Sequence, residues 1–368
     1  MNVLHIGVGN MFGGIETFLI DVAAHRHVCP EMKPAFALCF EGRMSESLRA
    51  TGVPVLMLGA MRASRPWSVW RVRRNLKALL KSNSFDAVIF HGTWSYGLLA
   101  GSIKNIGVKI VLWFHAACSE SNREDRRALK VEPDAIIANS RYTAESLPRF
   151  FPNVHTSIVH CVVSPPDIGD PKIVRAEIRA ELKTADDAVV ILQVSRIEEW
   201  KGHRVLIDAL SQLSGQAKWV CWIVGGPQRP KEDVLFDELK SKAKQLNVAE
   251  RVQFLGMRQD VQRVMAAADC FCQPNTDPEP FGLVFVEALY AGKPVLTSAF
   301  GGALEIIDAS CGMLVPPNDA RALKDVLCKW ITNESARCSL GQNGPARAAE
   351  LCAPVKTLLK LNSIVRNI

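Results

Sequence analysis

In Glu279-Pro-Phe-Gly-Leu-Val-Phe-Val-Glu287, two carboxylates stand eight positions apart on either side of a glycine. The apolar run at 269–273 predicts a strand before this stretch, and the pattern from Leu283 onward predicts a helix that opens at Gly282. The first N–H groups of a helix lack partners and carry the positive end of the helix dipole, so we expect them to bind phosphate. A strand, a turn and a helix in this order are typical of a parallel α/β sheet.

The two carboxylates suit a ligand that carries hydroxyl groups at both ends. Glu287 lies four residues beyond Leu283 on the same helix face, so it can accept hydrogen bonds from hydroxyls of a ligand whose phosphates contact the helix start. We expect Gly282, Leu283 and Val284 to contribute that phosphate contact. Glu279, on the loop, would contact the other end of the ligand. The alternative is that the two glutamates bind no ligand, and that one of them caps the helix while the other is solvated.

Two cations follow an earlier predicted strand in Val194-Ser-Arg196-Ile-Glu-Glu-Trp-Lys201-Gly202. A buried diphosphate needs a metal ion or protein cations to balance its charge. The chain contains no Asp-x-Asp sequence to hold a divalent ion. We therefore expect no metal and no cofactor, and we expect Arg196 and Lys201 to bind the diphosphate.

Both halves of the chain alternate short apolar strands with helical patterns, which predicts two doubly wound α/β domains. Three prolines between Val163 and Pro171 indicate a linker. We expect domains at 1–165 and 166–345, a tail at 346–368 that packs on the first domain, and a cleft between the two sheets. The expected helices include 15–27 and 68–82. The expected strands are 2–7, 35–40, 54–58, 86–90, 108–114, 135–138 and 157–161, then 188–194, 219–224, 252–255, 269–273, 294–298 and 312–315.

Other candidate residues also follow predicted strands. Gly13 and Gly14 form a glycine turn that offers backbone N–H groups to phosphate or acceptor. The spacing of this turn and the lack of an acidic residue at the end of the next strand argue against NAD. Gly225 and Met257 lie in loops that can contact a base. His115 either binds a sugar hydroxyl or is a partly buried imidazole, and the same two interpretations apply to a second histidine, at 91.

The net charge of +7 lies entirely in the first half, where residues 1–165 carry 19 Lys and Arg against 12 Asp and Glu. It is densest at 62–81, where Trp67 and Trp70 stand among the cations. This segment is either a solvated helix with inward-packing tryptophans or a surface that meets anionic lipid or a charged acceptor. No nucleic-acid-binding module accompanies it. No apolar run is long enough for a transmembrane helix. The eleven cysteines are scattered, which predicts reduced thiols and a cytoplasmic protein.

Several motifs together resemble the retaining family 4 glycosyltransferases of GT-B fold. They are Gly13-Gly14-Ile-Glu16, Arg196 with Lys201-Gly202, Glu279-Pro-Phe-Gly to Glu287-Ala, Gly292-Lys-Pro, Gly301-Gly302-Ala-Leu-Glu305 and Gly312-Met-Leu-Val-Pro-Pro-Asn-Asp319. The resemblance implies that Arg196 and Lys201 bind the diphosphate, Glu287 the ribose and Glu279 the transferred sugar. It implies further that His115 contacts the primary hydroxyl of that sugar and that Gly13-Gly14 close on phosphate and acceptor.

The resulting hypothesis is a retaining, metal-independent glycosyltransferase with a nucleotide-sugar donor and a glycan, lipid-linked or small-molecule acceptor. We expect it to act in surface polysaccharide or glycoconjugate synthesis, in the cytoplasm or at the inner face of the membrane. The alternatives are an epimerase or phosphorylase of GT-B fold and a non-catalytic subunit of a polysaccharide assembly complex. The donor base, the sugar and the acceptor are open at this point.

Overall fold

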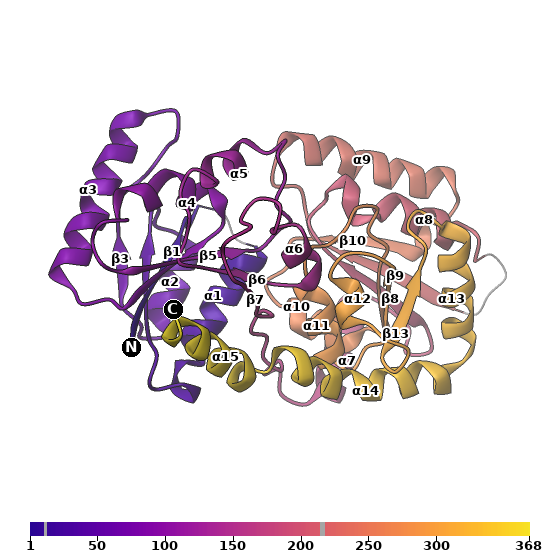
Figure 1. Cartoon of the computed structure of the whole chain (residues 1–368). Coiled ribbons are helices and arrows are strands. Elements are labelled where there is room, and N and C mark those ends of the chain that lie inside the picture. Colours follow the sequence, from indigo (N-terminus) through magenta and orange to yellow (C-terminus); the bar gives the residue numbers. More distant parts are fainter. Residues whose placement is uncertain (11–12, 214–217) are drawn as a thin grey trace. The chain divides into compact units, whose positions relative to one another are not determined.

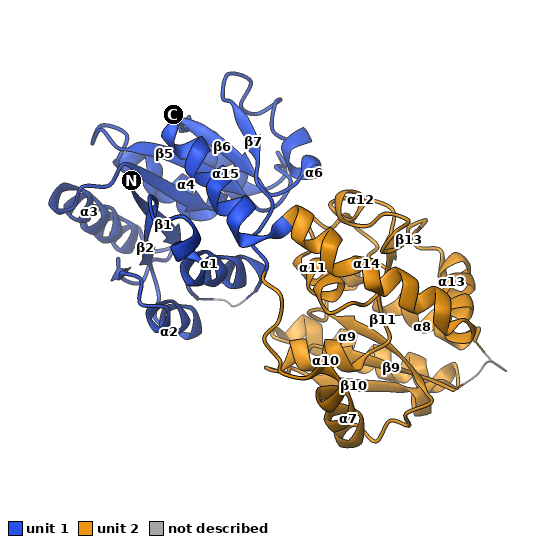
Figure 2. Cartoon of the chain, turned by 90° about the horizontal axis from the view of Figure 1, so that it is seen from below, with its two compact units in different colours: residues 1–163, 352–368 blue, residues 164–351 orange. Residues whose placement is uncertain are grey.

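The computed structural model describes residues 1–10, 13–213 and 218–368 of the chain. These residues divide into two compact units, one of Met1–Val163 with Cys352–Ile368 and the other of Ser164–Leu351 (Figure 2). The boundaries expected from the sequence lie after 165 and after 345. The structure divides the chain after Val163 and, within helix α14 (Glu334–Cys352), after Leu351, because that helix continues through Pro345.

Unit 1 contains a parallel sheet of seven described strands in the order β3-β2-β1-β4-β5-β6-β7. The strands are nearly continuous apolar runs because helices cover both faces of a parallel sheet. All seven expected strands are present; the second is shifted two residues toward the N-terminus, and the last, expected at 157–161, ends at Ile158. Their bounds are β1(Asn2–Gly7), β2(Lys33–Leu38), β3(Val55–Met57), β4(Ala87–His91), β5(Lys109–Phe114), β6(Ala135–Ala138) and β7(Thr156–Ile158).

The helices of unit 1 lie against the sheet (Figure 1). Their apolar side chains are buried on it. Residues Val72 and Leu76 of α3 pack in the same core cluster as Phe90 of β4 and Leu112 of β5. The helix expected at 15–27 ends at Ala24 and a short 3₁₀ turn follows. The helical elements are α1(Gly14–Ala24), η1(Arg26–Val28), α2(Arg43–Ala50), α3(Pro66–Ser82), α4(Thr93–Leu99), η2(Ala100–Ser102), α5(Arg123–Ala128), α6(Arg141–Glu145) and α15(Pro354–Arg366).

The C-terminal helix α15 packs on unit 1 near α1 and η1 (Figure 2). Leu358, Leu361 and Val365 of α15 are buried. At the end of the helix, Arg366 Nη2 lies 2.7 Å from Glu31 Oε2. Because this ion pair is half exposed, the buried leucines contribute most of the docking energy.

Unit 2 contains a parallel sheet of six described strands in the order β10-β9-β8-β11-β12-β13. These are the six strands that the sequence predicted, each within one residue of its expected bounds. The bounds are β8(Val189–Val194), β9(Trp219–Val224), β10(Val252–Gly256), β11(Cys270–Gln273), β12(Val295–Ser298) and β13(Gly312–Val315).

The core of unit 2 lies between its sheet and helices α8, α9 and α13, where Ile191, Leu210, Leu239 and Leu327 belong to one buried cluster. The helical elements are α7(Pro171–Glu181), η3(Glu199–Lys201), α8(His203–Ser211), α9(Pro230–Gln245), η4(Ala249–Arg251), α10(Val261–Ala267), α11(Leu283–Tyr290), α12(Ala303–Ile306), α13(Ala320–Thr332) and α14.

A buried ion pair holds α7 on the amino end of this sheet. Arg179, only 1% exposed, donates from Nη2 to Asp269 Oδ2 at 2.6 Å and from Nη1 to the carbonyls of Ala185 and Ala188. Asp269 Oδ2 also accepts the Val190 N–H of β8 at 2.7 Å. This arrangement satisfies both charges inside the fold, so it is structural.

Each sheet has one point at which the strand order reverses. In unit 1 this point lies between β1 and β4, and in unit 2 between β8 and β11. In open α/β sheets, ligands bind outside the carboxyl ends of the strands at such a point. A ligand site in unit 2 is therefore expected at the loops that follow β8 and β11.

Candidate functional site

An ion pair joins the two loops at the switch point of unit 2. Lys201 Nζ lies 2.6 Å from Glu279 Oε2, and the two side chains are only 13% and 14% exposed. Lys201 lies at the end of η3, after β8, and Glu279 lies in the loop between β11 and α11. The structure thus brings together two predicted site residues that are 78 positions apart in sequence.

Backbone contacts hold these loops in register. Gly202 has φ of 74°, and a Cβ there would lie 1.7 Å from the carbonyl oxygen of Pro274, so only glycine fits. Next to it, the N–H of Thr276 donates to the carbonyl of Trp200 at 2.8 Å. On the other side of the loop, the Gly302 N–H donates to the Glu279 carbonyl at 2.7 Å. Glu279 is therefore placed by its backbone as well as by its side chain.

Buried amide side chains at the carboxyl end of the sheet form hydrogen bonds that hold the ion pair and its loops. Asn275 Nδ2 donates to Glu279 Oε2 at 3.0 Å, and Gln273 Nε2 donates to Asn275 Oδ1 at 2.9 Å. On the neighbouring strand, Gln193 Nε2 donates to the Lys201 carbonyl at 2.8 Å. Because amides at the strand ends fix both loops, the ammonium and the carboxylate are held before any ligand arrives.

Arg196, the second predicted cation, pairs with a carboxylate that the sequence did not single out. Its Nη2 lies 2.9 Å from Glu198 Oε1, and the arginine side chain is 35% exposed. Glu198 also accepts the indole N–H of Trp200 at 3.1 Å, while Lys201 Nζ lies 3.7 Å from the centroid of the Trp200 ring. Both cations therefore have acidic or aromatic neighbours and retain further N–H donors for a ligand.

The start of α11 has the geometry of an anion-binding turn. Gly282 has φ of 109°, and a Cβ at this position would lie 2.4 Å from the Phe285 ring. Helix α11 then begins at Leu283, so the N–H groups of Leu283 and Val284 are the first of the helix and have no partner within it. Helix α11 begins at the residue that the sequence pattern predicts and ends at Tyr290.

Glu287 lies one turn into α11 and is partly buried. Burial raises the pKa of its carboxyl group from 4.5 to about 7. Among the described residues, no group donates a hydrogen bond to this carboxylate. A ligand that supplies hydroxyl donors would stabilise the ionised form and lower the pKa.

The loops after β9 and β10 border the same end of the sheet. Gly225 has φ of 132°, and its N–H donates to the Gly256 carbonyl at 2.8 Å. A Cβ on Gly225 would lie 1.8 Å from the carbonyl of Ser195, so this glycine lets the loops after β8 and β9 approach closely. Met257 is 71% exposed beside it. A flat apolar ligand group can pack on such an exposed methionine.

The remaining predicted residues lie in unit 1. The Gly13 N–H donates to Glu16 Oε2 at 2.9 Å, and α1 begins at Gly14. His115 follows β5, and its ring stacks on Trp113 with centroids 5.7 Å apart. Its Nε2 lies 3.0 Å from Nδ1 of His91. The structure thus groups the histidines in unit 1 and the acid and cation pairs in unit 2.

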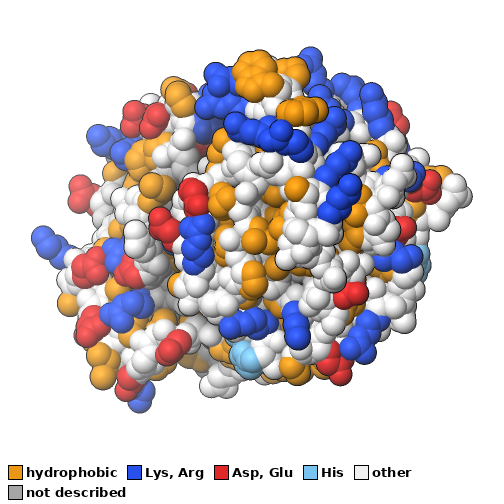
Figure 3. Space-filling view, turned by 90° about the vertical axis from the view of Figure 1, so that its left-hand side faces the viewer, with side chains coloured by type: hydrophobic (Ala, Val, Ile, Leu, Met, Phe, Trp, Pro, Cys, Tyr) orange, Lys and Arg blue, Asp and Glu red, His pale blue; other side chains and the backbone are white. Residues whose placement is uncertain are grey.

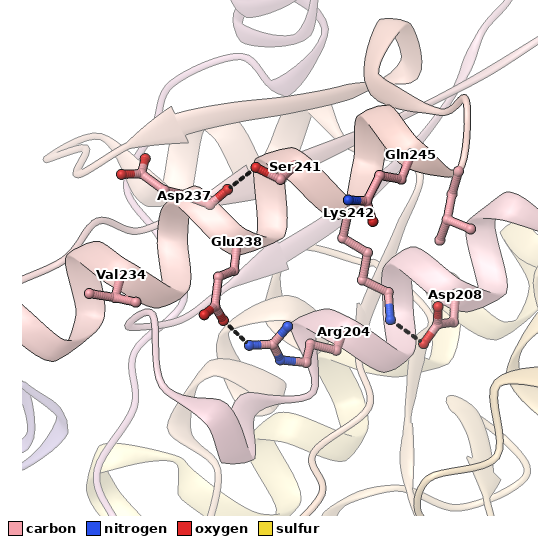
Figure 4. A pocket seen from close by; sticks show the side chains of 9 residues that line it. Arg204, Asp208, Val234, Asp237, Glu238, Ser241, Lys242 and Gln245 are labelled. Atoms are coloured by element: carbon pink, nitrogen blue, oxygen red, sulfur yellow. Dashed lines mark hydrogen bonds and ion pairs between the residues drawn. The ribbon is translucent and has the colours of Figure 1, made fainter.

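A separate pocket lies between α8 and α9 of unit 2 (Figure 4). Two ion pairs lie in it: Arg204 with Glu238, and Lys242 with Asp208 at 2.7 Å. None of the predicted site residues lines it.

Two further features concern metals and membranes. In the described part of the chain, no group of three His, Cys, Asp or Glu side chains has the arrangement of a metal site. Nor does any described helix have the length and apolar character needed to cross a bilayer. All eleven cysteines are free.

Sequence reasoning missed the supporting residues of the site. Gln193 is the last residue but one of β8 and Gln273 is the last residue of β11, and both strands are otherwise apolar; a polar residue in such a place indicates a buried polar contact at the carboxyl end of the sheet. The partner of Arg196 lies two residues further on and gave no signal of its own. His5, to which the sequence pattern assigns no role, contacts His91.

Two family profiles cover most of the chain. The profile of glycosyl transferases group 1 matches residues 174–347, and that of glycosyltransferase family 4 matches residues 12–165. Curated relatives include the lipopolysaccharide core biosynthesis glycosyltransferase LpsE of Rhizobium meliloti, 30% identical over 45% of this chain and 46% of that protein. The match to the human alpha-1,3/1,6-mannosyltransferase ALG2 is 29% identical and covers 60% and 55%. The chain thus aligns with about half the length of these relatives.

A longer match is found with a GDP-mannose-dependent phosphatidylinositol monomannoside mannosyltransferase of Corynebacterium glutamicum, 25% identical over 73% of both chains. Solved structures share the fold. Anabaena Alr3699/HepE in complex with UDP-glucose has a TM-score of 0.85 at 23% identity and covers 100% of both chains. WaaG, a glycosyltransferase involved in lipopolysaccharide biosynthesis, has a TM-score of 0.73 at 19% identity and covers 99% of both.

Proposed function

Because this chain belongs to the group 1 and family 4 glycosyltransferases, we propose that it transfers a sugar with retention, without a metal ion, from a nucleotide-diphosphate-sugar. The acceptor is a glycan, a lipid-linked glycan or a small molecule. Relatives named for lipopolysaccharide core and phosphatidylinositol mannoside synthesis support a role in surface glycoconjugates. The observation that carries the proposal is the Lys201–Glu279 pair at the switch point, beside Arg196 and the start of α11.

The diphosphate binds at the start of α11 in this proposal. The N–H groups of Leu283 and Val284 and the helix dipole favour an anion there. Lys201 offers ammonium donors beyond the one directed at Glu279, and Arg196 has donors beyond those directed at Glu198. A phosphate that enters this site gains charge-assisted hydrogen bonds from the remaining donors of both cations, and such bonds are stronger than hydrogen bonds between neutral groups.

Glu287 and Glu279 bind the two ends of the donor. The carboxylate of Glu287 accepts hydrogen bonds from the ribose hydroxyls, for which it has no competing partner among the described residues. Met257 and the Gly225 loop contact the base. Glu279 contacts hydroxyls of the transferred sugar with the oxygen that Lys201 and Asn275 leave available.

The chemistry follows from where charge develops. Breaking the anomeric bond leaves negative charge on the terminal phosphate, and fixed cations and N–H donors stabilise that charge in the transition state. The acceptor hydroxyl attacks from the face that the phosphate leaves, and its proton passes to the leaving phosphate oxygen. This route needs no carboxylate base and gives retention at the anomeric carbon. For unit 1, the family resemblance assigns His115 a hydroxyl of the transferred sugar and the Gly13-Gly14 turn the phosphate and the acceptor.

A donor and acceptor screen tests this function. The full chain is incubated with UDP- and GDP-sugars, with and without lipid-linked and free glycan acceptors, in excess EDTA. The expected result is nucleotide diphosphate release that depends on acceptor and is unchanged by the chelator. Epimerised donor without acceptor, or activity that only a divalent ion restores, would overturn the transferase or the metal-independent part respectively.

The basic helix α3 supports a peripheral position at an anionic membrane on the cytoplasmic side. Trp67 and Trp70 are 65% and 63% exposed, so the interpretation in which they pack inward is wrong. The opposite face of α3 buries Val69, Val72 and Leu76. The view of unit 1 in Figure 3 has apolar side chains ringed by Lys and Arg. Exposed indoles among cations suit the headgroup region of an anionic bilayer.

Arg74 and Lys77 are the two cations of α3 that are suitable for a test. Arg71 and Arg73 are not suitable, because they donate to the carbonyls of Ala60 and Leu98 and their loss would also disturb the fold. Arg74→Glu with Lys77→Glu should instead abolish sedimentation with phosphatidylglycerol vesicles and leave the melting temperature unchanged. Lys231→Glu on the exposed face of α9 is the control. Equal binding of all variants, or equal binding to neutral vesicles, would contradict membrane association.

A further inference from the structure

Three histidines form a hydrogen-bonded chain on one face of the sheet in unit 1. His5 Nδ1 lies 2.9 Å from His91 Nε2, and His91 Nδ1 lies 3.0 Å from His115 Nε2. Strand pairing explains this arrangement, since His5 pairs with Ile89 in register and His91 pairs with Trp113. Each histidine is thus one strand over and two residues further along than the last, and side chains two residues apart share a face.

All three imidazoles are neutral at physiological pH. Burial lowers the pKa of His5 and of His115 from 6.5 to about 3 each. The pKa of His91 is also lowered well below its usual range, by burial and then by its histidine neighbours. A neutral imidazole has one N–H donor and one acceptor nitrogen. His91, which is bonded on both sides, must therefore donate to one neighbour and accept from the other.

The buried end of the chain decides between the two directions. His5 is fully buried, and its Nε2 has no hydrogen-bond partner among the described residues. If His91 donated to His5, the proton of His5 would be on Nε2 and would be a buried N–H without an acceptor. Such orphaned donors are rarer in proteins than acceptors that lack a partner. The other direction leaves only a bare nitrogen at the buried end.

We infer that His5 and His91 are positioning residues that hold His115 in its Nδ1–H tautomer. His5 donates from Nδ1 to His91, and His91 donates from Nδ1 to His115 Nε2. The remaining nitrogen, His115 Nδ1, is the one without a partner among the described residues, and it carries the proton outward. His115 therefore offers a ligand a hydrogen-bond donor and cannot serve as a base.

Aromatic contacts fix the plane of the His115 ring as well. Its stacking partner Trp113 is inclined by only 9°, and Phe18 of α1 lies 5.7 Å away on centroids. Ring and tautomer are thus both set before a ligand binds. The inference rests on the proposed function only for the nature of the ligand. In that function, the atom that accepts the hydrogen bond from His115 is a hydroxyl oxygen of the transferred sugar. A fixed donor suits that oxygen, and the absence of a base agrees with a proton that passes to the leaving phosphate.

The tautomers are measured by ¹⁵N NMR of the imidazole rings in the full chain without ligand, at pH 7. The expected result is that His5, His91 and His115 all carry their proton on Nδ1, with the exposed His155 as the reference for a histidine in water. Protons on Nε2 of His91 and His115, or an imidazolium signal at any of the three, would overturn the inference. This readout needs no substrate, so it is independent of whether the proposed transfer is found.

Variants test the positioning role. His91→Phe removes the donor to His115, so the Nε2 signal of His115 should move to that of a nitrogen without a hydrogen bond. Its kcat/KM should fall on the order of tenfold or more, as when residues that orient metal-binding histidines are removed. His5→Phe, which keeps an aromatic ring beside Phe36, should cause a smaller fall and serves if His91→Phe fails to fold. Unchanged His115 signals in both variants would contradict the positioning role.

Discussion

Replacing Glu287 by Gln should remove a pH dependence of nucleotide binding that this carboxyl group creates. Its pKa is raised by burial to about 7, so at pH 6 most of the free protein carries a neutral Glu287. Two ribose hydroxyls that donate to one carboxylate require the ionised form. Binding must then release a proton at pH 6 but not at pH 8.

The size of the effect follows from that pKa. For a group that titrates near 7 in the free protein and is ionised in the complex, affinity falls about tenfold from pH 8 to pH 6, or about 1.4 kcal/mol. Calorimetric titrations with UDP and with GDP at both pH values measure this change. The terminal phosphate of each nucleotide also titrates in this range. The Glu287→Gln protein therefore serves as the control, because it keeps the phosphate contribution and loses only that of the carboxyl group.

The Glu287 carboxyl group should also make the free energy of unfolding depend on pH. This free energy falls as pH rises, whereas nucleotide affinity rises with pH. A carboxyl group whose pKa is higher in the folded chain than in the unfolded chain costs stability as pH rises from 4.5 to about 7. The cost is at most about 3 kcal/mol and is constant above pH 7. Glu287→Gln should therefore be more stable than the parent at pH 8 and equal to it at pH 4. In the binding experiment, the same change of nucleotide affinity with pH in the parent and in Glu287→Gln would refute the assignment of this pH dependence to Glu287.

Four further substitutions test other parts of the account. Lys201→Ala should lower kcat by about two orders of magnitude or more with the fold intact, and so should Arg196→Ala; a near-native rate in either would remove that residue from the mechanism. Gly282→Ala should cost about 1–3 kcal/mol of unfolding free energy in urea, because its φ of 109° and the Phe285 ring exclude a side chain. Arg179→Met should cost about 1–3 kcal/mol by the same assay, because it removes one of the two guanidinium partners of Asp269 and leaves Arg175 as the other; no loss would argue against a structural role for the Arg179 contact.

The strands could be predicted from the sequence because each is a short apolar run bounded by turn residues. The thirteen expected strands are all present, and the helix that begins at Leu283 starts where the glycine before it indicated. Boundaries were less accurate where a helix continues through a proline, as α14 does through Pro345. A proline alone does not end a helix when packing on both sides is retained.

Strand order was beyond the reach of the sequence. Lys201 and Glu279 are joined because β8 and β11 are neighbours, and that adjacency depends on the crossover from β10. The sequence motifs indicated that Lys201 and Glu279 are site residues, but they did not predict the ion pair between them. His5 was missed for the same reason, since a histidine in an apolar strand signals nothing until the neighbouring strands bring His91 beside it.

The central claim is that a diphosphate binds at the start of α11, held by Arg196 and Lys201. A crystal structure of the full chain grown with UDP or GDP tests it most directly. The account predicts phosphate oxygens at about 3 Å from the N–H of Leu283 or Val284 and from the Lys201 ammonium. A nucleotide bound elsewhere, for example in the pocket between α8 and α9, with Lys201 still paired only to Glu279, would contradict it.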